Sequence, residues 1–174
     1  ACAYGTKRIH HATKGALIVN LGAGTSEIAV VNSYGVIVAE TMKRGGKDLD
    51  QDILHFIREK YSLMIGESTA EKLKTTIGTL REDRQNDAME VSGRDLVTGM
   101  PKNIDVYASD VTQAILPFIR ILLDRIHFTL EKTPPELAAD VMEHGIMLSG
   151  GGAQLDGLCD YVMQEMHVPS MLSP

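Results

Sequence analysis

Three short runs of β-forming residues, separated by turn residues, constrain the fold of this chain more than any other feature. The runs cover 16–21, 26–31 and 36–42, and glycine occurs in both turns between them. Short apolar runs rich in β-branched residues, with glycine between them, are typical of strands joined by tight turns. The sequence therefore predicts a β-meander near the start of the chain.

Helical periodicity replaces the strand pattern after Gly46. Apolar residues at helical spacing predict helices over 48–61 and 68–77. We expect Asp48 to cap the first helix, and Ser68 with Glu71 to form a capping box at the start of the second. A polar surface loop over 78–87 and a β-hairpin over 88–97 and 102–107 are expected to follow.

The longest helical pattern covers 109–131 and contains Pro117, which predicts a kink or a displaced start. The rest of the chain predicts a short helix, a strand, a glycine turn, a last helix and the beginning of another strand. These elements are expected at 134–144, 146–148, 149–152, 155–166 and 168–174.

The distribution of these elements predicts an α/β fold with two subdomains. Residues 16–47 and 109–174 supply strands and apolar helices for one mixed sheet. Residues 48–108 form a small α+β insertion with its own helices and hairpin. We interpret residues 1–15 as an N-terminal linker.

Composition and charge exclude several classes of function. The net charge is −6, with no block of five or more basic residues, which argues against a nucleic-acid partner. The two cysteines, Cys2 and Cys159, form no disulfide framework, and the six histidines have no zinc spacing. No apolar run is long enough for a membrane span. We therefore expect a cytoplasmic protein without a metal site formed by its own residues and without a transmembrane segment.

Two glycine turns are the candidate binding elements. Asn20 to Thr25 connects two apolar strands, so its backbone N–H groups and the Thr25 hydroxyl are candidates to face an anion. Ser149 to Ala153 lies between a strand and a helix, where the helix N-terminus favours phosphate or ribose groups. One such turn is usually structural, but two at strand ends favour a nucleotide. Neither a P-loop nor a Rossmann glycine pattern is present.

Longer stretches of the sequence resemble a known family. The glycine turns resemble the phosphate-binding and adenosine-binding turns of the superfamily of actin, heat-shock chaperones and sugar kinases. Further stretches are similar to the MreB family of bacterial actin-like cell-shape proteins. These stretches are 45–50, 57–61, 65–71, 93–102 and 130–140.

The resemblance implies an actin-like ATPase fold of the ribonuclease-H-like kind, of which this chain is domain II only. Residues 16–47 and 109–174 correspond to subdomain IIA on the nucleotide side, and 48–108 to subdomain IIB. The family's other domain contains the first phosphate loop and the glutamate that positions the attacking water. We therefore expect no catalytic residue in this chain, and no activity from it alone.

The resemblance also implies which residues bind ATP. Ala23, Gly24 and Thr25 touch the phosphates, within the hairpin that includes Asn20 and Gly22. Glu71 and Lys74 contribute to the adenosine pocket, and Gly150, Gly151, Gly152 and Ala153 close over the nucleoside. ATP and Mg²⁺ are implied for the full-length protein, with weak or absent binding by this fragment. Without the resemblance, the sequence favours a solvated surface pair for Glu71 and Lys74, because charged residues on helices are usually exposed.

Two positions depart from the family pattern. Asn20 stands where the family usually has Asp, and an amide offers no charge to a hard cation. Ala23 stands where glycine is usual, and its methyl group discourages a positive φ. We expect weak nucleotide binding or slow hydrolysis from these changes.

The implied function is that of an actin-like subunit that forms ATP-dependent filaments and guides cell-wall synthesis in rod-shaped bacteria. Its partners are further copies of itself and the wall-elongation machinery at the membrane, and ATPase activity in the family is weak. An alternative is a filament scaffold independent of nucleotide, with a degenerate site at Asn20 and Ala23. A chaperone-like or sugar-kinase ATPase shares the glycine turns but lacks the stretches 93–101 and 131–137.

Overall fold

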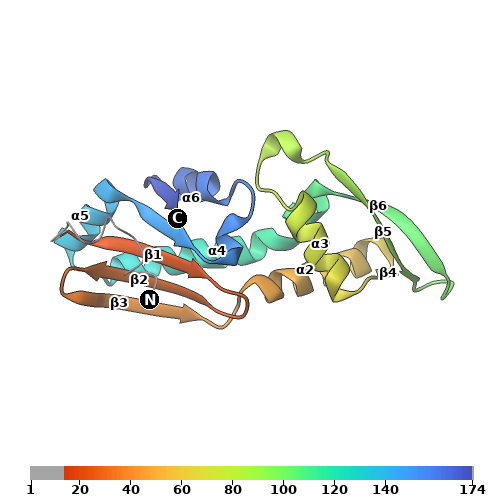
Figure 1. The fold of residues 1–174 in the computed structure, drawn as a ribbon, viewed down its shortest axis with the longest axis horizontal. Helices are drawn as coiled ribbons and strands as arrows, with labels where there is room; N and C mark the ends of the chain where they lie inside the picture. Colours follow the sequence, from red (N-terminus) through yellow and green to blue (C-terminus); the bar gives the residue numbers. More distant parts are fainter. Residues whose placement is uncertain (1–13, 174) are drawn as a thin grey trace. The chain divides into compact units, whose positions relative to one another are not determined.

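A mixed five-stranded sheet contains the three strands of the predicted meander (Figure 1). The structure is a computed structural model that describes residues 14–173. The predicted linker therefore lies outside the described residues, apart from Lys14 and Gly15. In spatial order the strands are β3 (Gly35–Met42), β2 (Ser26–Asn32), β1 (Ala16–Leu21), β7 (Ile146–Ser149) and β8 (Ser170–Leu172).

Strand β1 is where the direction of pairing changes. It runs antiparallel to β2, which in turn pairs antiparallel with β3, so the meander is confirmed. On its other side β1 pairs parallel with β7, and β7 pairs parallel with β8. Leu17, Ile18 and Val19 are all buried, which means that both faces of this central strand are covered.

The chain divides into two units by its internal contacts. Of the described residues, unit 1 contains 14–46, 120–154 and 158–173, and unit 2 contains 47–119 and 155–157. The long helix α4 (Ala108–Glu131) contributes its first half to unit 2 and its second half to unit 1. The subdomain boundaries expected from the sequence stay a prediction.

Unit 1 places two short helices against its sheet. Helix α5 (Pro135–His144) packs against β1, and α6 (Leu158–Met166) packs against β8. Gly145 ends α5 with a φ of +95°, and its N–H donates to the Val141 carbonyl oxygen at 2.7 Å. This helix end agrees with the sequence, because glycine adopts a positive φ without a steric penalty.

Unit 2 contains two helices and a three-stranded sheet. The helices are α2 (Gly46–Tyr61) and α3 (Glu67–Ile77), and the sheet order is β4 (Leu63–Met64), β5 (Ala88–Asp95) and β6 (Pro101–Tyr107). The predicted hairpin is confirmed, since β5 and β6 pair antiparallel. Strand β4 pairs antiparallel with β5 and was not expected from the sequence, because two residues show no periodicity.

The predicted helix caps are wrong for both helices of unit 2. Helix α2 already begins at Gly46, which places Asp48 in its first turn and not at its N-cap. Helix α3 has Gly66 at its N-cap, with no hydrogen bond from a capping side chain. The Ser68 and Glu71 pair therefore lies inside α3. Both helices therefore begin earlier than the cap pattern predicts, α2 at Gly46 and α3 directly after Gly66.

Three other expectations also need correction. Helix α4 begins at Ala108 and contains Pro117, so the proline does not displace its start, and a kink at Pro117 stays a prediction. The last helix begins at Leu158 and not near Leu155. The loop over 78–87 contains the short 3₁₀ helix η2 (Glu82–Arg84) and the fully buried Thr79, so it is only partly a surface loop.

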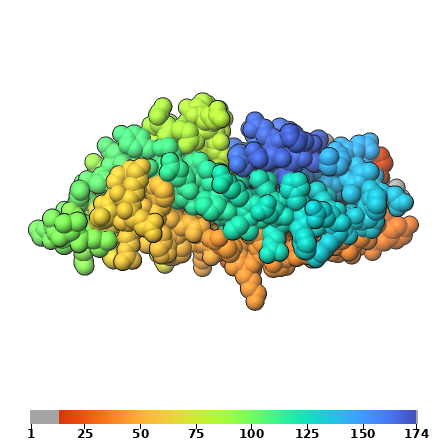
Figure 2. All heavy atoms as spheres, turned by 180° about the vertical axis from the view of Figure 1, so that it is seen from behind, coloured from red at the N-terminus to blue at the C-terminus, as the bar shows by residue number. Residues whose placement is uncertain are grey.

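Helix α4 also has an exposed side. Figure 2 shows this helix at the surface, and Ile121 and Phe128 on it are 39% and 40% exposed.

Despite its length, neither α4 nor any other helix within residues 14–173 is apolar enough over a sufficient span to cross a membrane.

A buried carboxylate secures the start of α4. Asp110 accepts hydrogen bonds from the Lys60 ammonium and, at 2.6 Å, from the Tyr61 hydroxyl. It also accepts a bond from the Tyr107 backbone N–H, which precedes the helix. Burial raises the pKa of Asp110, but the bonds from Lys60 and Tyr61 outweigh burial and hold that pKa below its ordinary value.

Replacing Asp110 is expected to destabilise the chain. Asp110→Ala removes the acceptor of three donors, two on α2 and one at the end of β6, and we expect the free energy of unfolding to fall by roughly 2–4 kcal/mol. The exposed Asp124 lies on the same helix, and Asp124→Ala is expected to change it by less than about 0.5 kcal/mol. Urea unfolding followed by circular dichroism measures both. Equal effects of the two variants would contradict this role of Asp110.

Candidate functional site

The two glycine turns predicted from the sequence begin at neighbouring strand ends. Parallel pairing of β1 with β7 places Asn20 opposite Ser149. Because parallel strands end at the same edge of a sheet, the turn after β1 and the turn after β7 leave that edge side by side. Gly150 and Gly152 both lie against Leu21, the last residue of β1. Unit 1 therefore brings the predicted residues of both turns together.

The turn between β1 and β2 is held by the segment that follows β3. Within the turn, the Gly22 N–H donates to the Thr25 carbonyl oxygen at 2.9 Å. The Gly46 N–H donates to the Gly22 carbonyl oxygen at 2.9 Å, and the Ser26 hydroxyl donates to the Arg44 carbonyl oxygen at 2.8 Å. These bonds fix the turn before any ligand is considered.

Gly45 is a structural requirement of this turn that sequence reasoning missed. A Cβ atom at Gly45 would lie 2.5 Å from the Gly22 carbonyl oxygen and 2.8 Å from the Ala23 carbonyl carbon. These distances are too short for any side chain. The only sequence signal was the Gly45-Gly46 pair itself, and no local pattern indicates that it contacts the earlier turn.

Gly150 allows the second turn to approach β1. Its φ is +85°, and a Cβ there would collide with the Leu21 carbonyl oxygen and lie 2.8 Å from Asn20 Oδ1. Gly24 and Gly151 differ, because nothing lies within 4 Å of a Cβ at either position. Gly150 therefore serves the packing of the two turns, while Gly24 and Gly151 leave open space beside exposed backbone.

The second turn does not lead into a helix N-terminus, contrary to expectation. After Gly150 the chain forms the 3₁₀ helix η3 (Gly151–Gln154), in which the Ala153 N–H donates to the Gly150 carbonyl oxygen at 3.1 Å. Helix α6 begins only at Leu158. A helix-dipole contribution at this turn is therefore not supported. Ala153 is itself buried, so its side chain offers no surface to a ligand.

Asn20 lies in a polar row that crosses three strands. Its Oδ1 accepts a hydrogen bond from the Ser149 hydroxyl at 3.3 Å, and its Nδ2 donates to Glu27 Oε2 at 3.5 Å. Glu27 is the register partner of Asn20 on β2. Sequence reasoning missed Glu27, whose carboxylate lies close to the Asn20 amide.

The backbone conformation of Ala23 does not require the positive φ that an alanine side chain would disfavour. Among the described residues, Ser62 and His167 are the non-glycine positions with a positive φ, and Ala23 is not among them. The alanine therefore adopts its conformation without left-handed strain. The alanine at position 23 therefore only adds an exposed methyl group to the turn.

The other two predicted site residues, Glu71 and Lys74, lie on α3 in unit 2. Glu71 is exposed, whereas Lys74 is largely buried. The Lys74 ammonium lies 2.7 Å from Asp50 Oδ1 on α2. A solvated surface pair is thus the wrong description of Lys74. Sequence reasoning missed Asp50, because its contact with Lys74 joins two different helices and leaves no periodic pattern in the sequence.

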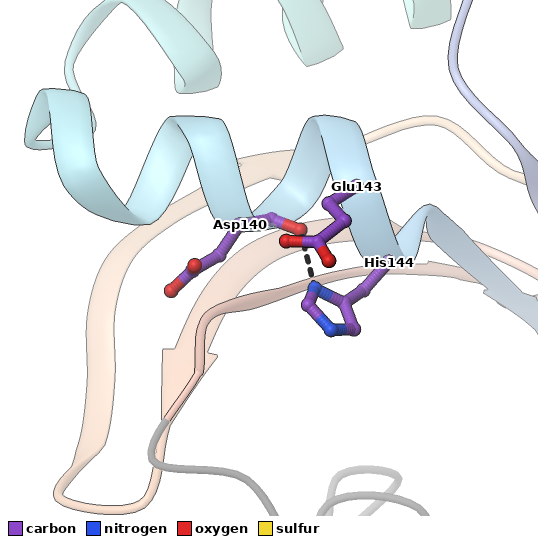
Figure 3. A group of neighbouring side chains, drawn as sticks. All are labelled: Asp140, Glu143 and His144. Atoms are coloured by element: carbon purple, nitrogen blue, oxygen red, sulfur yellow. Dashed lines mark hydrogen bonds between the residues drawn. The ribbon is translucent and has the colours of Figure 1, made fainter.

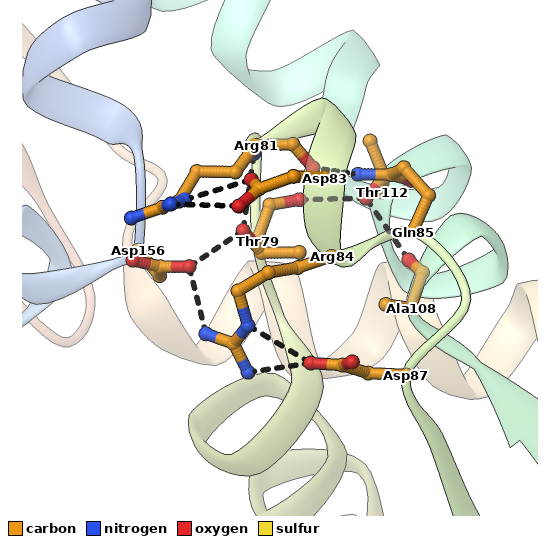
Figure 4. A network of polar contacts seen from close by, with 9 residues as sticks. All are labelled: Thr79, Arg81, Asp83, Arg84, Gln85, Asp87, Ala108, Thr112 and Asp156. Atoms are coloured by element: carbon orange, nitrogen blue, oxygen red, sulfur yellow. Dashed lines mark hydrogen bonds and ion pairs between the residues drawn. The ribbon is translucent and has the colours of Figure 1, made fainter.

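A second polar cluster in unit 2 is centred on Asp156. Figure 4 shows Thr79 and Arg84 pointing toward its carboxylate, at 2.7 and 2.8 Å. The Leu80 N–H also donates to the Asp156 carbonyl oxygen at 2.8 Å, next to an isolated parallel bridge between Thr79 and Asp156. The bond from Thr79, with help from Arg84, holds the pKa of Asp156 below its ordinary value. These contacts fasten residues 155–157 to the loop of unit 2.

One group of side chains on α5 has the composition of a metal site. Asp140, Glu143 and His144 have ligand-type atoms within 4.8 Å of one another (Figure 3). Each already has a protein partner, however. Asp140 accepts from the Gly15 N–H at 2.9 Å, Glu143 lies 3.7 Å from the Lys14 ammonium, and His144 Nδ1 contacts the Asp140 carbonyl oxygen at 2.8 Å. These contacts give the group a structural explanation.

Comparison with known sequences gives a consistent result. The family profile described as MreB/Mbl protein matches residues 1–174. The cell shape-determining protein Mbl of Bacillus cereus is 36% identical over 91% of this chain and 48% of its own length. The cell shape-determining protein MreB of Escherichia coli is 33% identical over 91% of this chain and 46% of its own length. The chain thus spans about half the length of the curated relatives it matches.

Solved structures confirm the predicted fold. The crystal structure of MreB 5 of Spiroplasma citri bound to AMPPNP is 33% identical, with a TM-score of 0.94 over 98% of this chain and 51% of that chain. The same protein bound to ADP gives a TM-score of 0.95 at 32% identity, over 99% of this chain and 53% of that chain. The MamK double helical filament, at 22% identity and a TM-score of 0.75 over 91% of this chain and 49% of that chain, supports the fold alone.

Substitution of Gly150 is expected to disturb the contact between the two turns. Gly150→Ala introduces a Cβ at a positive φ against the Leu21 carbonyl oxygen, so we expect a loss of roughly 1–3 kcal/mol of unfolding free energy. Gly24→Ala is the matched control, because its Cβ enters open space, and a change below about 0.5 kcal/mol is expected. Chemical denaturation compares them. A Gly150→Ala variant as stable as Gly24→Ala would refute the contact.

Proposed function

The chain belongs to the MreB/Mbl family, and from this premise we propose that it is the nucleotide-side half of an actin-like cytoskeletal protein that binds ATP and assembles into filaments. One observation carries the proposal. The two glycine turns, which are 129 residues apart at Asn20 and Ser149, leave neighbouring strand ends in unit 1. The carboxyl ends of parallel strands are where open α/β sheets bind ligands.

The turns have the chemistry of a phosphate site. Ala23, Gly24 and Thr25 are exposed, and so are Gly150 and Gly151. Exposed backbone N–H groups of consecutive turn residues attract anions, and glycine lets a phosphate oxygen come close to them. We assign the phosphates of ATP to the turn that contains Asn20, Gly22, Ala23, Gly24 and Thr25.

The nucleoside is assigned to the second glycine turn, which lies in unit 1. Gly150, Gly151, Gly152 and Ala153 are proposed to contact it through their backbone, since the Ala153 side chain is buried. For unit 2 taken by itself, we propose from the family resemblance that Glu71 and Lys74 are adenosine contacts. The relatives from Spiroplasma citri are bound to AMPPNP and ADP, which supports an adenine nucleotide. From the family resemblance we also propose that residues 16–47 and 109–174 form subdomain IIA and that residues 48–108 form subdomain IIB.

The residues beside the phosphate turn are compatible with Mg²⁺. This cation takes oxygen ligands and usually keeps several waters. Asn20 and Glu27 offer an amide oxygen and a carboxylate side by side, and only Glu27 is charged. We propose that these two side chains hydrogen-bond the water shell of an Mg²⁺ that accompanies the triphosphate and helps to neutralise its charge. With a neutral residue at position 20, hydrolysis is expected to be slow.

The cellular part of the proposal follows from the relatives, which are cell shape-determining proteins. We propose cytoplasmic filaments, associated with the membrane in the full-length protein, that guide cell-wall synthesis in a rod-shaped bacterium. A filament scaffold independent of nucleotide is the second candidate. It is favoured by the neutral Asn20 and by the methyl group of Ala23 in the phosphate turn.

A charge placed in the phosphate turn tests the binding site. In the full-length protein, Gly24→Glu is expected to weaken ADP and AMPPNP binding by about tenfold or more, because its carboxylate repels the phosphates. Gly24→Gln has nearly the same shape without the charge and is the matched control, since a Cβ at Gly24 meets open space. Calorimetric titration measures the affinities. Equal affinities of the two variants for ADP and AMPPNP would contradict the proposal that the phosphates bind at this turn.

Assembly of the full-length protein separates the two candidate functions. We expect filaments by electron microscopy with ATP and Mg²⁺, and few without them, because a nucleotide-dependent subunit must bind ATP to reach its assembling state. Because Gly24→Glu is expected to bind nucleotide weakly, we expect few filaments from this variant even when ATP and Mg²⁺ are present. Filaments that form equally well without nucleotide would favour the scaffold.

A further inference from the structure

The turn between β5 and β6 exposes apolar side chains in unit 2. Within this turn, residues 95–100, which we call the hairpin tip, Val97 is 82% exposed, Met100 64% and Leu96 40%. Figure 1 shows the tip projecting beyond helices α2 and α3 of the same unit. Single exposed apolar residues are common on protein surfaces, but these three lie within one short turn and form a patch. Such a patch indicates contact with an apolar partner.

The backbone of the hairpin tip has its hydrogen-bond donors paired within unit 2. The tip residues whose N–H groups donate to oxygen atoms of this unit, at 2.7 to 3.3 Å, are Asp95, Leu96, Val97, Gly99 and Met100. One of these bonds, from Leu96 to the Ser62 carbonyl oxygen at 2.8 Å, fastens the tip to the end of α2. Because an unpaired N–H group is costly in an apolar medium, this pairing makes the tip suited to enter one.

The acidic residue of the hairpin tip is used within the turn. Asp95 Oδ1 accepts a hydrogen bond from the Val97 N–H at 2.9 Å. This bond, with help from the nearby charge of Lys102, outweighs burial and holds the pKa of Asp95 below its ordinary value. The carboxylate therefore stabilises the turn and has a basic residue beside it.

The charges of the hairpin are separated along its length. Arg94 and Lys102 are exposed and flank the tip on β5 and β6. Glu90 and Asp105 are also exposed and lie opposite each other, about 13 Å further along the strands from Arg94. The basic residues thus lie next to the apolar tip and the acidic residues lie away from it, although the net charge of the whole chain is −6. This arrangement is complementary to an apolar medium with an anionic surface.

We propose that the hairpin tip inserts into the surface of an anionic lipid bilayer. Leu96, Val97 and Met100 enter the boundary of the acyl chains, while Arg94 and Lys102 contact the anionic headgroups. The basic flanks favour this partner over an apolar protein surface, which offers them no opposite charge. The inference rests on the membrane association within the proposed function, and it names the element that makes the contact.

A tryptophan placed in the tip tests insertion. This chain contains no tryptophan, and the emission of Val97→Trp in the full-length protein is measured as the difference from the wild type. With vesicles of phosphatidylglycerol and phosphatidylcholine, we expect this emission to shift to shorter wavelength and brominated acyl chains to quench it, because the ring enters the bilayer interface. Tyr107→Trp, at the other end of β6 and also exposed, is the matched control and is expected to show neither change.

Vesicle cosedimentation of the full-length protein tests the basic flank. Lys102→Gln is expected to weaken binding to vesicles that contain phosphatidylglycerol by about fivefold, because one basic residue near an anionic surface loses its attraction. Its weaker binding to vesicles of phosphatidylcholine alone is expected to stay unchanged. Lys72→Gln removes the same charge from an exposed position on α3 and is the matched control, with no change expected on either kind of vesicle.

Three results would overturn the inference. One is an unshifted emission of Val97→Trp on vesicles that bind the protein, and another is an equal loss of binding in Lys102→Gln and Lys72→Gln. The third is a shift that grows with protein concentration without vesicles, which would assign the tip to a second copy of the chain. If the wild type binds no vesicles, the proposed membrane association fails and this inference fails with it. If the wild type binds and only the tip variants contradict expectation, the role of the tip alone is lost.

Discussion

The close approach of Gly150 to the end of β1 is the contact on which the candidate site depends. Parallel pairing of β1 with β7 brings two distant segments to one sheet edge. The second turn then has to pass over the Leu21 carbonyl oxygen, where no side chain fits. Glycine at this position is therefore a packing requirement first. Its consequence is that two exposed turns, one after each strand, share a single edge of unit 1.

Beside this contact, the amide of Asn20 forms hydrogen bonds to both neighbouring strands. Asn20 accepts from Ser149 and donates to Glu27, so it uses both ends of its amide within one row of strands. An ionised aspartate at the same position accepts hydrogen bonds but donates none, and it would face the Glu27 carboxylate. The asparagine thus suits its surroundings in this chain. The negative charge available beside the turn belongs to β2 and not to β1.

Unit 2 is organised differently, because carboxylates join its elements. Asp110 connects the start of α4 to the end of α2, and Asp156 connects residues 155–157 to the loop after α3. Asp50 connects α2 to α3 through Lys74. The first two have several hydrogen-bond donors around them, which offsets the cost of removing a charge from water. The pair of Asp50 and Lys74 joins the two helices through an ion pair whose side chains are both largely buried.

The sequence alone determined the elements that depend on local periodicity and on glycine. The meander over 16–42, the hairpin of β5 and β6, and the end of α5 at Gly145 all follow from short-range patterns. Both glycine turns were also found, and the family resemblance supplied the residues around them. The predicted helix starts at Asp48 and Ser68 were wrong, because the path of the preceding chain decides where the first helical turn forms. Tertiary structure alone decided the pairing of β1 with β7, the contact of Gly45 with Gly22, and the partners of Asn20 and Lys74. Each of these joins segments whose separation in sequence leaves no periodic trace, since packing and hydrogen bonding act between surfaces that meet only after the chain has folded.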